Sequence, residues 1–500
     1  MRSSGRILAS VLCLLASSAA AEPNFTARVR NYAQAHRSDI LAEYLKLLSL
    51  PNIHGDAPAL QRNAALLQEM MKKRGLDTAL WQTSGGVPVV FGEKRMRGAA
   101  RTILFYVHYD GQPVDPKRWH QADPFVPVIR TTSIEEGGKI VTDPSVPSDQ
   151  WRVYARSSAD DKAPIEALLC ALDALNGETK ANVKIILHGE EEGSGPGLEE
   201  VIAKYPDRLK SDLLVILDGP QHASGQPTIF YGARGGAGLD LTVYTAKQGL
   251  HSGNYDNWMP DANVRLAQLI SAMVSPDGKV TIPGFYSDVA PFSPEVRLLL
   301  DQVPDRSAKM QQDFGVGSLD GAASSLQEGL NLPTFSIHQM KGGEVGGVIA
   351  AHADAQIAMR LVAENDPEVM VERVTQFIRA QGYFITDKEP DIATLASHAR
   401  IARVVARLPG GGSGAWRTDP DNPQAVFATE ALRAVWGDRL VRIRTLGGGV
   451  PASSFINAYH MPTVGVSLAN YDDNQHSDNE NMRLGNLFEG MVTLSALMMH

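Results

Sequence analysis

The chain of 500 residues contains only two cysteines, Cys13 and Cys170. The first lies in a segment that we expect to be removed, so the second has no partner and an intrachain disulfide is excluded. Cys170 falls within an apolar helical pattern, which favours a buried, inert thiol over a nucleophile. The sequence also lacks an internal run of about eighteen apolar residues, so no membrane-spanning helix is expected after the start of the chain.

Basic residues are also fewer than acidic residues. The 47 Lys and Arg residues are outnumbered by 56 Asp and Glu residues, and the formal charge is -9. An acidic surface argues against nucleic acids and anionic membranes as partners. The apolar content of 43% and the charged content of 21% are ordinary for a soluble globular protein. Because 500 residues are too many for one ordinary compact domain, two domains are expected.

The start of the chain has the pattern of a secretory signal peptide. A basic beginning, a mostly apolar stretch over 7–16 that is too short to cross a bilayer, and small residues up to Ala21 follow one another. We therefore expect residues 1–21 to be cleaved and the protein to be exported to the periplasm or the extracellular space. A lipid anchor at Cys13 is not expected, because leucine stands where a lipoprotein has a small residue.

The rest of the chain predicts an α/β fold with a second, inserted α+β unit. Apolar runs of strand length at 102–107, 183–187 and 213–217 are separated in part by helical patterns, which is typical of a central mixed sheet flanked by helices. Near residue 236 the pattern changes to a strand with period-two alternation at 239–244, which is followed by an amphipathic helix at 262–273 and a later helix at 367–380. We predict one domain from residues 22–235 and 399–500, with a smaller domain inserted at 236–398.

Metal-binding types of side chain follow the three predicted strands. His108 ends the first run, the triplet 190–192 of glutamates follows the second, and Asp218 follows the third. Open α/β sheets bind ligands beyond the carboxyl ends of their strands, so these side chains are expected at one edge. They are ligands that zinc and similar cations accept. Three neighbouring glutamates would repel one another unless a cation neutralised them.

Two further residues fit a metal site, but each has an ordinary explanation. Asp160 precedes a predicted helix and His476 lies in a polar loop near the end of the chain. The first could simply cap the helix, and the second could be an exposed loop residue. From spacing alone, metal binding and structural roles are equally good interpretations of these residues.

Eight motifs in order resemble the dinuclear-zinc exopeptidase family, which includes carnosine dipeptidase, aminoacylase, succinyl-diaminopimelate desuccinylase and bacterial glutamate carboxypeptidase. The motifs are His108-Tyr109-Asp110, Trp119 with Asp123-Pro124-Phe125, Asp160-Asp161-Lys162, Glu191-Glu192-Gly193-Ser194, Asp218, Leu250-His251-Ser252-Gly253, Arg360-Leu361-Val362 and His476-Ser477-Asp478-Asn479-Glu480. The resemblance runs from about residue 38 to the end. The second motif points to the carnosine-dipeptidase branch.

The resemblance implies a site with two divalent metal ions, most simply zinc, with manganese or cobalt as alternatives. It implies that Asp160 bridges both ions. His108 and Asp218 then complete one ion site, and Glu192 and His476 complete the other. The family also implies a catalytic domain and an inserted lid or dimerisation domain.

The same resemblance assigns four further roles. Glu191 is the general base that takes a proton from the metal-bridging water. Asp110 hydrogen-bonds the ring of His108. His251 reaches across a homodimer into the partner's site and helps to hold the oxyanion. Arg360 binds the carboxylate of the substrate.

The chain departs from the family at the substrate-binding positions. Gly347, Gly411 and Gly449 stand where polar side chains usually help to bind the substrate carboxylate. Gly449 can still donate its backbone N–H, but a glycine supplies no hydroxyl or imidazole. We therefore expect a roomier or less polar pocket than that of a typical dipeptidase.

These observations predict a metal-dependent hydrolase that cleaves the amide bonds of small peptides, as a dipeptidase or carboxypeptidase. The alternative is an N-acyl-amino-acid deacylase, which would prefer an apolar acyl group near the metals. A non-catalytic homologue is less favoured, because Glu191 and all five ligand positions are present.

Overall fold

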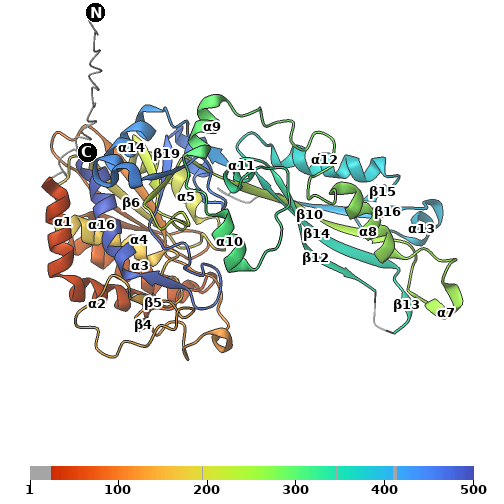
Figure 1. The fold of residues 1–500 in the computed structure, drawn as a ribbon, viewed down its shortest axis with the longest axis horizontal. Coiled ribbons are helices and arrows are strands. Elements are labelled where there is room, and N and C mark those ends of the chain that lie inside the picture. The colour runs from red at the N-terminus through yellow and green to blue at the C-terminus, as the bar shows by residue number, and fades with distance from the viewer. Residues whose placement is uncertain (1–23, 194, 344–345, 409–413) are drawn as a thin grey trace, which may run out of the picture.

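The computed structural model describes residues 24–193, 195–343, 346–408 and 414–500. The predicted signal peptide and Gly411 lie outside these ranges. The described chain forms two bodies, which stand side by side in Figure 1. We call them the catalytic domain, residues 24–234 and 414–500, and the lid domain, residues 235–407.

An eight-stranded mixed sheet forms the centre of the catalytic domain. Its strands in spatial order are β1 (Asp77–Trp81), β2 (Val89–Lys94), β6 (Asn182–His188), β3 (Thr102–His108), β7 (Leu213–Ile216), β19 (Thr463–Ser467), β8 (Thr228–Phe230) and β18 (Val441–Ile443). The four neighbours β6, β3, β7 and β19 run parallel, whereas β2 is antiparallel to β6 and β8 is antiparallel to β19. This confirms the predicted fold class.

Helices bury both faces of this sheet. The helices over one face are α1 (Asn24–Ala35), α2 (Arg37–Leu48), α3 (Ala57–Lys73), α4 (Lys162–Ala174), α14 (Pro423–Trp436) and α16 (Leu484–Met499). The helices α5 (Gly197–Lys204) and α15 (Ser453–Tyr459) pack on the other. On β3, Phe105 packs on the first face and Tyr106 on the second, as the two-residue period of a strand requires. Each such buried side chain stabilises the fold by roughly 1.5–3 kcal/mol.

The lid domain is a five-stranded sheet with helices on one face. Its strands in spatial order are β12 (Thr334–Gly342), β14 (His352–Leu361), β10 (Gly235–Tyr244), β16 (Ile401–Arg407) and β15 (Phe384–Thr386). The helices α8 (Ala262–Met273) and α12 (Pro367–Ala380) share a core with the odd-numbered residues of β10, such as Leu241. The even-numbered residues of β10 therefore lie on the opposite face of the sheet.

The end of the lid domain lies later in the chain than residue 398. Strand β16 (401–407) pairs with β10 and so belongs to the lid sheet. The chain re-enters the catalytic domain at β17 (Trp416–Arg417), which pairs with β9 (Gly232–Ala233). The apolar run at 401–405 suits a strand of either sheet, so periodicity alone does not assign it.

Several short elements complete the structure. They are the sheet of β4 (Val128–Arg130), β5 (Arg152–Tyr154) and β20 (Asn481–Arg483), the pair β11 (Leu250–His251) and β13 (Val348–Ile349), and the helices α6 (Pro206–Leu209), α7 (Ser252–Tyr255), α9 (Pro294–Asp301), α10 (Ser307–Phe314), α11 (Leu326–Leu330) and α13 (Ile392–Ser397). In Figure 1, α9, α10 and α11 lie where the two domains meet. Within the described ranges, every helix is too short or too polar to cross a bilayer.

Candidate active site

The predicted metal ligands meet at the carboxyl ends of the parallel strands. His108 is the last residue of β3, Glu192 lies in the loop after β6, and Asp218 follows β7. Asp160 precedes α4, and His476 comes from the loop between β19 and β20. Five residues that span more than 360 positions of the sequence thus share one edge of the sheet.

These five residues form two overlapping groups. One comprises His108, Asp160 and Asp218, and the other comprises Asp160, Glu192 and His476, each with ligand atoms within 4.8 Å of one another. His108 Nε2 lies 2.8 Å from Asp160 Oδ1, and His476 Nε2 lies 3.0 Å from Asp160 Oδ2. One carboxylate therefore faces both groups, one oxygen to each histidine.

The electrostatics of these groups suit bound cations. Burial, together with the charges of neighbouring carboxylates, raises the pKa of Glu191 to about 8 and that of Glu192 to about 7. Burial and the charge of Asp160 raise the pKa of Asp218 to about 6. Cations among these carboxylates would offset this repulsion, and imidazole with carboxylate donors suits zinc, manganese or cobalt. The residues present therefore fit two divalent ions.

Asp110 positions both the histidine and the acidic loop. His108 Nδ1 lies 3.1 Å from the backbone carbonyl oxygen of Asp110 and 3.4 Å from its carboxylate. The carboxylate itself accepts hydrogen bonds from the backbone N–H groups of Glu191 and Glu192, at 3.2 and 3.0 Å. Asp110 thus supports the ring chiefly through its carbonyl, and its carboxylate fixes the loop that carries the base and one ligand.

Sequence reasoning gave no role to Glu480 or Gln112, which also support the site. The buried Glu480 carboxylate accepts hydrogen bonds from the backbone N–H groups of Ser157, Ala159 and Asp160 at 2.8–2.9 Å. Gln112 Nε2 donates to Glu192 Oε2 at 2.7 Å. Glu480 appeared in the sequence only as the last residue of the final motif, without a role, because a glutamate in a polar loop is usually solvated, and a lone glutamine has no characteristic pattern.

A cleft of about 870 Å³ joins this edge of the sheet to the lid domain. Arg360, near the end of β14, and the loop 446–451 both line it. Gly449 belongs to this loop, and a Cβ atom there would lie 3.1 Å from the carbonyl oxygen of Arg234. A side chain at Gly449 would therefore be in tight contact with the backbone just before β10, and it would fit only if the loop or this backbone shifted by a few tenths of an ångström.

His251 lies away from the cleft of its own chain. It is exposed in β11, which pairs with β13, and the Ser252 backbone N–H donates to the Gly347 carbonyl at 2.8 Å. In Figure 1 the neighbouring α7 and β13 occupy the end of the lid domain that is far from the catalytic domain. The structure thus brings His251 and Gly347 together, but apart from the predicted metal ligands.

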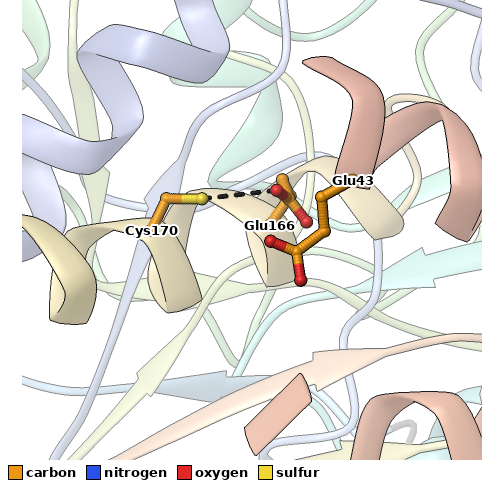
Figure 2. A group of neighbouring side chains, drawn as sticks. All are labelled: Glu43, Glu166 and Cys170. Atoms are coloured by element: carbon orange, nitrogen blue, oxygen red, sulfur yellow. Dashed lines mark hydrogen bonds between the residues drawn. The ribbon is translucent and has the colours of Figure 1, made fainter. Parts of the chain in front are cut away.

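A second acidic group lies between α2 and α4, two of the helices that cover one face of the catalytic sheet (Figure 2). Glu43, Glu166 and Cys170 have potential ligand atoms within 4.8 Å of one another. However, Glu43 is paired with Arg74 at 2.8 Å, and the Cys170 thiol donates to Glu166 at 3.3 Å. Burial raises the pKa of Glu166 to about 8, which favours its neutral form. This group is therefore best explained as a buried polar cluster, and Cys170 is the inert thiol that was predicted.

Two histidine–carboxylate groups in a cleft between an α/β domain and a lid define a two-domain metallohydrolase. Residues 104–500 match the model of peptidase family M20/M25/M40, and the chain belongs to this family. It is a metal-dependent hydrolase that acts on peptides, of a carnosine-dipeptidase-like branch.

Known relatives agree with this assignment. The human Beta-Ala-His dipeptidase is 27% identical over 424 residues, which are 82% of this chain and 76% of that protein. The cysteinylglycine-S-conjugate dipeptidase of Corynebacterium striatum is 25% identical over 454 residues, 87% of this chain and 88% of that protein. An M20 family metallo-carboxypeptidase from Sulfolobus solfataricus superposes with a TM-score of 0.73 at 25% identity, covering 92% of this chain and 98% of that one. The aminoacylase alternative is not favoured by these findings.

Proposed function

We propose that the protein is a two-metal exopeptidase that cleaves dipeptides or removes the C-terminal residue of other small peptides. The observation that supports this proposal most strongly is that the carboxylates of the site occupy different positions relative to the two ligand groups. Asp160 belongs to both ligand groups, whereas Glu191 lies beside them and belongs to neither. The set of nitrogen and oxygen ligands favours zinc, and manganese or cobalt would also suit it. The names of the human and Corynebacterium relatives support dipeptides as substrates.

Arg360 and Glu191 then have separate chemical roles in the cleft. Arg360 binds the C-terminal carboxylate in bidentate fashion, which directs the adjacent amide bond toward the acidic edge. Bound metal ions supply Lewis acidity, which polarises the amide carbonyl and stabilises its negative charge. Glu191 accepts the proton of the attacking water and passes it to the leaving amine.

The position of His251 supports a homodimer. His251 does not reach the cleft of its own chain, because the neighbouring α7 and β13 lie at the end of the lid domain that is far from the catalytic domain. A second chain could place its own His251 over the cleft, as the family resemblance implies. We propose that two chains complete each other's sites in this way.

We also propose that the protein is exported after cleavage of residues 1–21. The proposal is supported by the basic start, the short apolar centre and the small residues before Glu22. An acidic chain whose single remaining cysteine is buried does not need an oxidising compartment to fold, and it would tolerate one.

A hydrolysis screen tests the proposed activity. The chain starting at residue 22, reconstituted with zinc, manganese or cobalt, should hydrolyse dipeptides better than the matching N-acetyl amino acids. Elemental analysis should find about two divalent ions per chain. Full activity in a preparation that contains no metal, or turnover of N-acyl amino acids alone, would contradict the proposal.

A further inference from the structure

We propose that the cleft selects peptides whose C-terminal residue carries an acidic side chain, and that Arg407 binds this second carboxylate. The inference rests on the proposed function, in which Arg360 binds the C-terminal α-carboxylate. It adds a residue to which neither the motifs nor the relatives assign a role. It is supported by the residues on the face of the lid sheet that lines the cleft.

Strand β10 lies between the two arginines and has a glycine opposite each of them. Gly236 of β10 is opposite Arg360 of β14, and Gly238 is opposite Arg407 of β16. Residues directly opposite each other in a sheet share a face, and all four of these line the cleft. The strand spacing and rise place the two arginine Cα atoms about 12 Å apart. Two long side chains at this separation can converge on one small ligand above the glycines.

Arg407 is held in place without using up its donors. Its Nε lies 3.3 Å from Asp240 Oδ1, and its Nη2 donates to the Ile357 carbonyl oxygen at 3.1 Å. The ion pair is weak, because both side chains are about 40% exposed (42% and 41%). A guanidinium has five N–H donors, so these contacts orient the group and leave it able to bind another carboxylate.

The cleft is divided by charge. Every carboxylate among its described lining residues belongs to the catalytic domain, whereas the lid contributes Arg360, Arg407 and the imidazole of His338. His338 lies where the pairing of β12 with β14 shifts register, an irregularity that redirects side chains. The nearby Arg234 adds positive charge, and its burial together with the charge of Arg360 lowers its pKa to about 10.

This charge division favours a substrate with two carboxylates at one end. One bidentate arginine suffices for the C-terminal carboxylate of an ordinary peptide. A peptide with a neutral C-terminal side chain would leave the second arginine without a substrate partner. The cleft would therefore bind such a peptide less tightly than a peptide with an acidic C-terminal side chain. Aspartyl or glutamyl C-terminal residues place a second carboxylate a few bonds from the first and satisfy both arginines.

The dipeptides Ala-Glu and Ala-Gln provide the test, because their C-terminal side chains differ in charge but hardly in shape. The metal-loaded enzyme should show a kcat/KM for Ala-Glu that exceeds that for Ala-Gln by about tenfold to a hundredfold, the range of a charge-assisted hydrogen bond. Arg407→Gln should remove this preference by lowering turnover of Ala-Glu, with little change for Ala-Gln.

Arg403→Gln is the matched control. Arg403 lies on the same strand and face but four residues away, about 13 Å along β16, where it contacts Thr242. This variant should keep the full preference for Ala-Glu. Equal kcat/KM values of the unaltered enzyme for both dipeptides would overturn the inference. So would an equal loss for both in Arg407→Gln, since that would mean that Arg407 helps to bind the α-carboxylate.

A binding experiment separates this inference from the proposed function. Calorimetry with Glu191→Gln and the same two dipeptides should show tighter binding of Ala-Glu, and Arg407→Gln in that background should abolish the difference. Equal affinities would refute the inference even if both dipeptides are hydrolysed. Selective binding without hydrolysis by the unaltered enzyme would instead count against the proposed function alone.

Discussion

The buried carboxyl of Glu166 makes the stability of the catalytic domain depend on pH. Glu166 is fully buried in α4, the helix that follows Asp160. One of its oxygens accepts a hydrogen bond from the Cys170 thiol, and the other has no hydrogen-bond partner among the described residues (Figure 2). Burial raises its pKa from 4.5 to about 8. In the unfolded chain the same carboxyl is hydrated and ionises near its ordinary pKa.

The sign and size of the effect follow from this difference. Between about pH 4.5 and pH 8 the folded protein holds a proton on Glu166 that the unfolded chain has lost. Stability therefore falls as the pH rises through this window. Each tenfold change in proton affinity corresponds to about 1.4 kcal/mol, so the free energy of unfolding falls by about 4 kcal/mol between pH 4.5 and pH 8. Glu166→Gln cannot ionise, so the variant should escape this loss and match the unaltered protein at pH 5.

Urea unfolding followed by tryptophan fluorescence measures the effect. Five of the six tryptophans lie in the catalytic domain, and only Trp258 lies in the lid, so the signal reports on the right domain. The free energy of unfolding of Glu166→Gln should exceed that of the unaltered protein by an amount that grows from pH 5 to pH 8. Glu69→Gln, at an exposed position of α3, should show no such growth. A difference between Glu166→Gln and the unaltered protein that stays constant with pH would refute the reasoning.

Three further predictions concern catalysis and export. Glu191→Gln should nearly abolish turnover with both metals retained, whereas Glu192→Gln should also lose metal; elemental analysis that finds the reverse would exchange the two roles. His251→Ala should lower turnover about a hundredfold to a thousandfold. Co-expression of His251→Ala with Glu191→Gln should restore activity in mixed dimers, and verified mixed dimers that stay inactive would exclude action across the dimer. N-terminal sequencing of exported protein should begin near Glu22, and an intact Met1 would contradict cleavage.

Regular elements with strong patterns could be predicted closely from the sequence. The helices at 262–273 and 367–380 agree with α8 and α12 to the residue, because each has an aspartate cap and a clear apolar face. The strand ends that carry His108 and Asp218 were also predicted, since short apolar runs precede them. Helices α9, α10 and α11 were not predicted, because they span eight residues at most and bury few side chains.

The site was predictable only in part, because its support comes from distant backbone contacts. Asp160 and His476 had to be recognised by resemblance, since a cap and a loop residue have the same local pattern. The contacts of Glu480 with the loop 157–160 join positions more than 300 residues apart. Nothing in local periodicity encodes such pairs. The role of Arg407 was hidden for a similar reason, because it depends on which sheet β16 joins.

The strand order has a consequence for how the chain folds. Within the part of the chain that the structure describes, strand β8 (228–230) pairs only with β19 and β18, which are synthesised more than 200 residues later. Strand β19 also separates β8 from β7, its nearest predecessor in the sequence. The N-terminal half therefore emerges from the ribosome with an open sheet edge, and the gap at its centre is filled only when residues 463–467 arrive. Such non-local pairing makes folding slow and exposes the growing chain to aggregation. A chain truncated before β19 should consequently lose the whole catalytic sheet rather than its last strand alone.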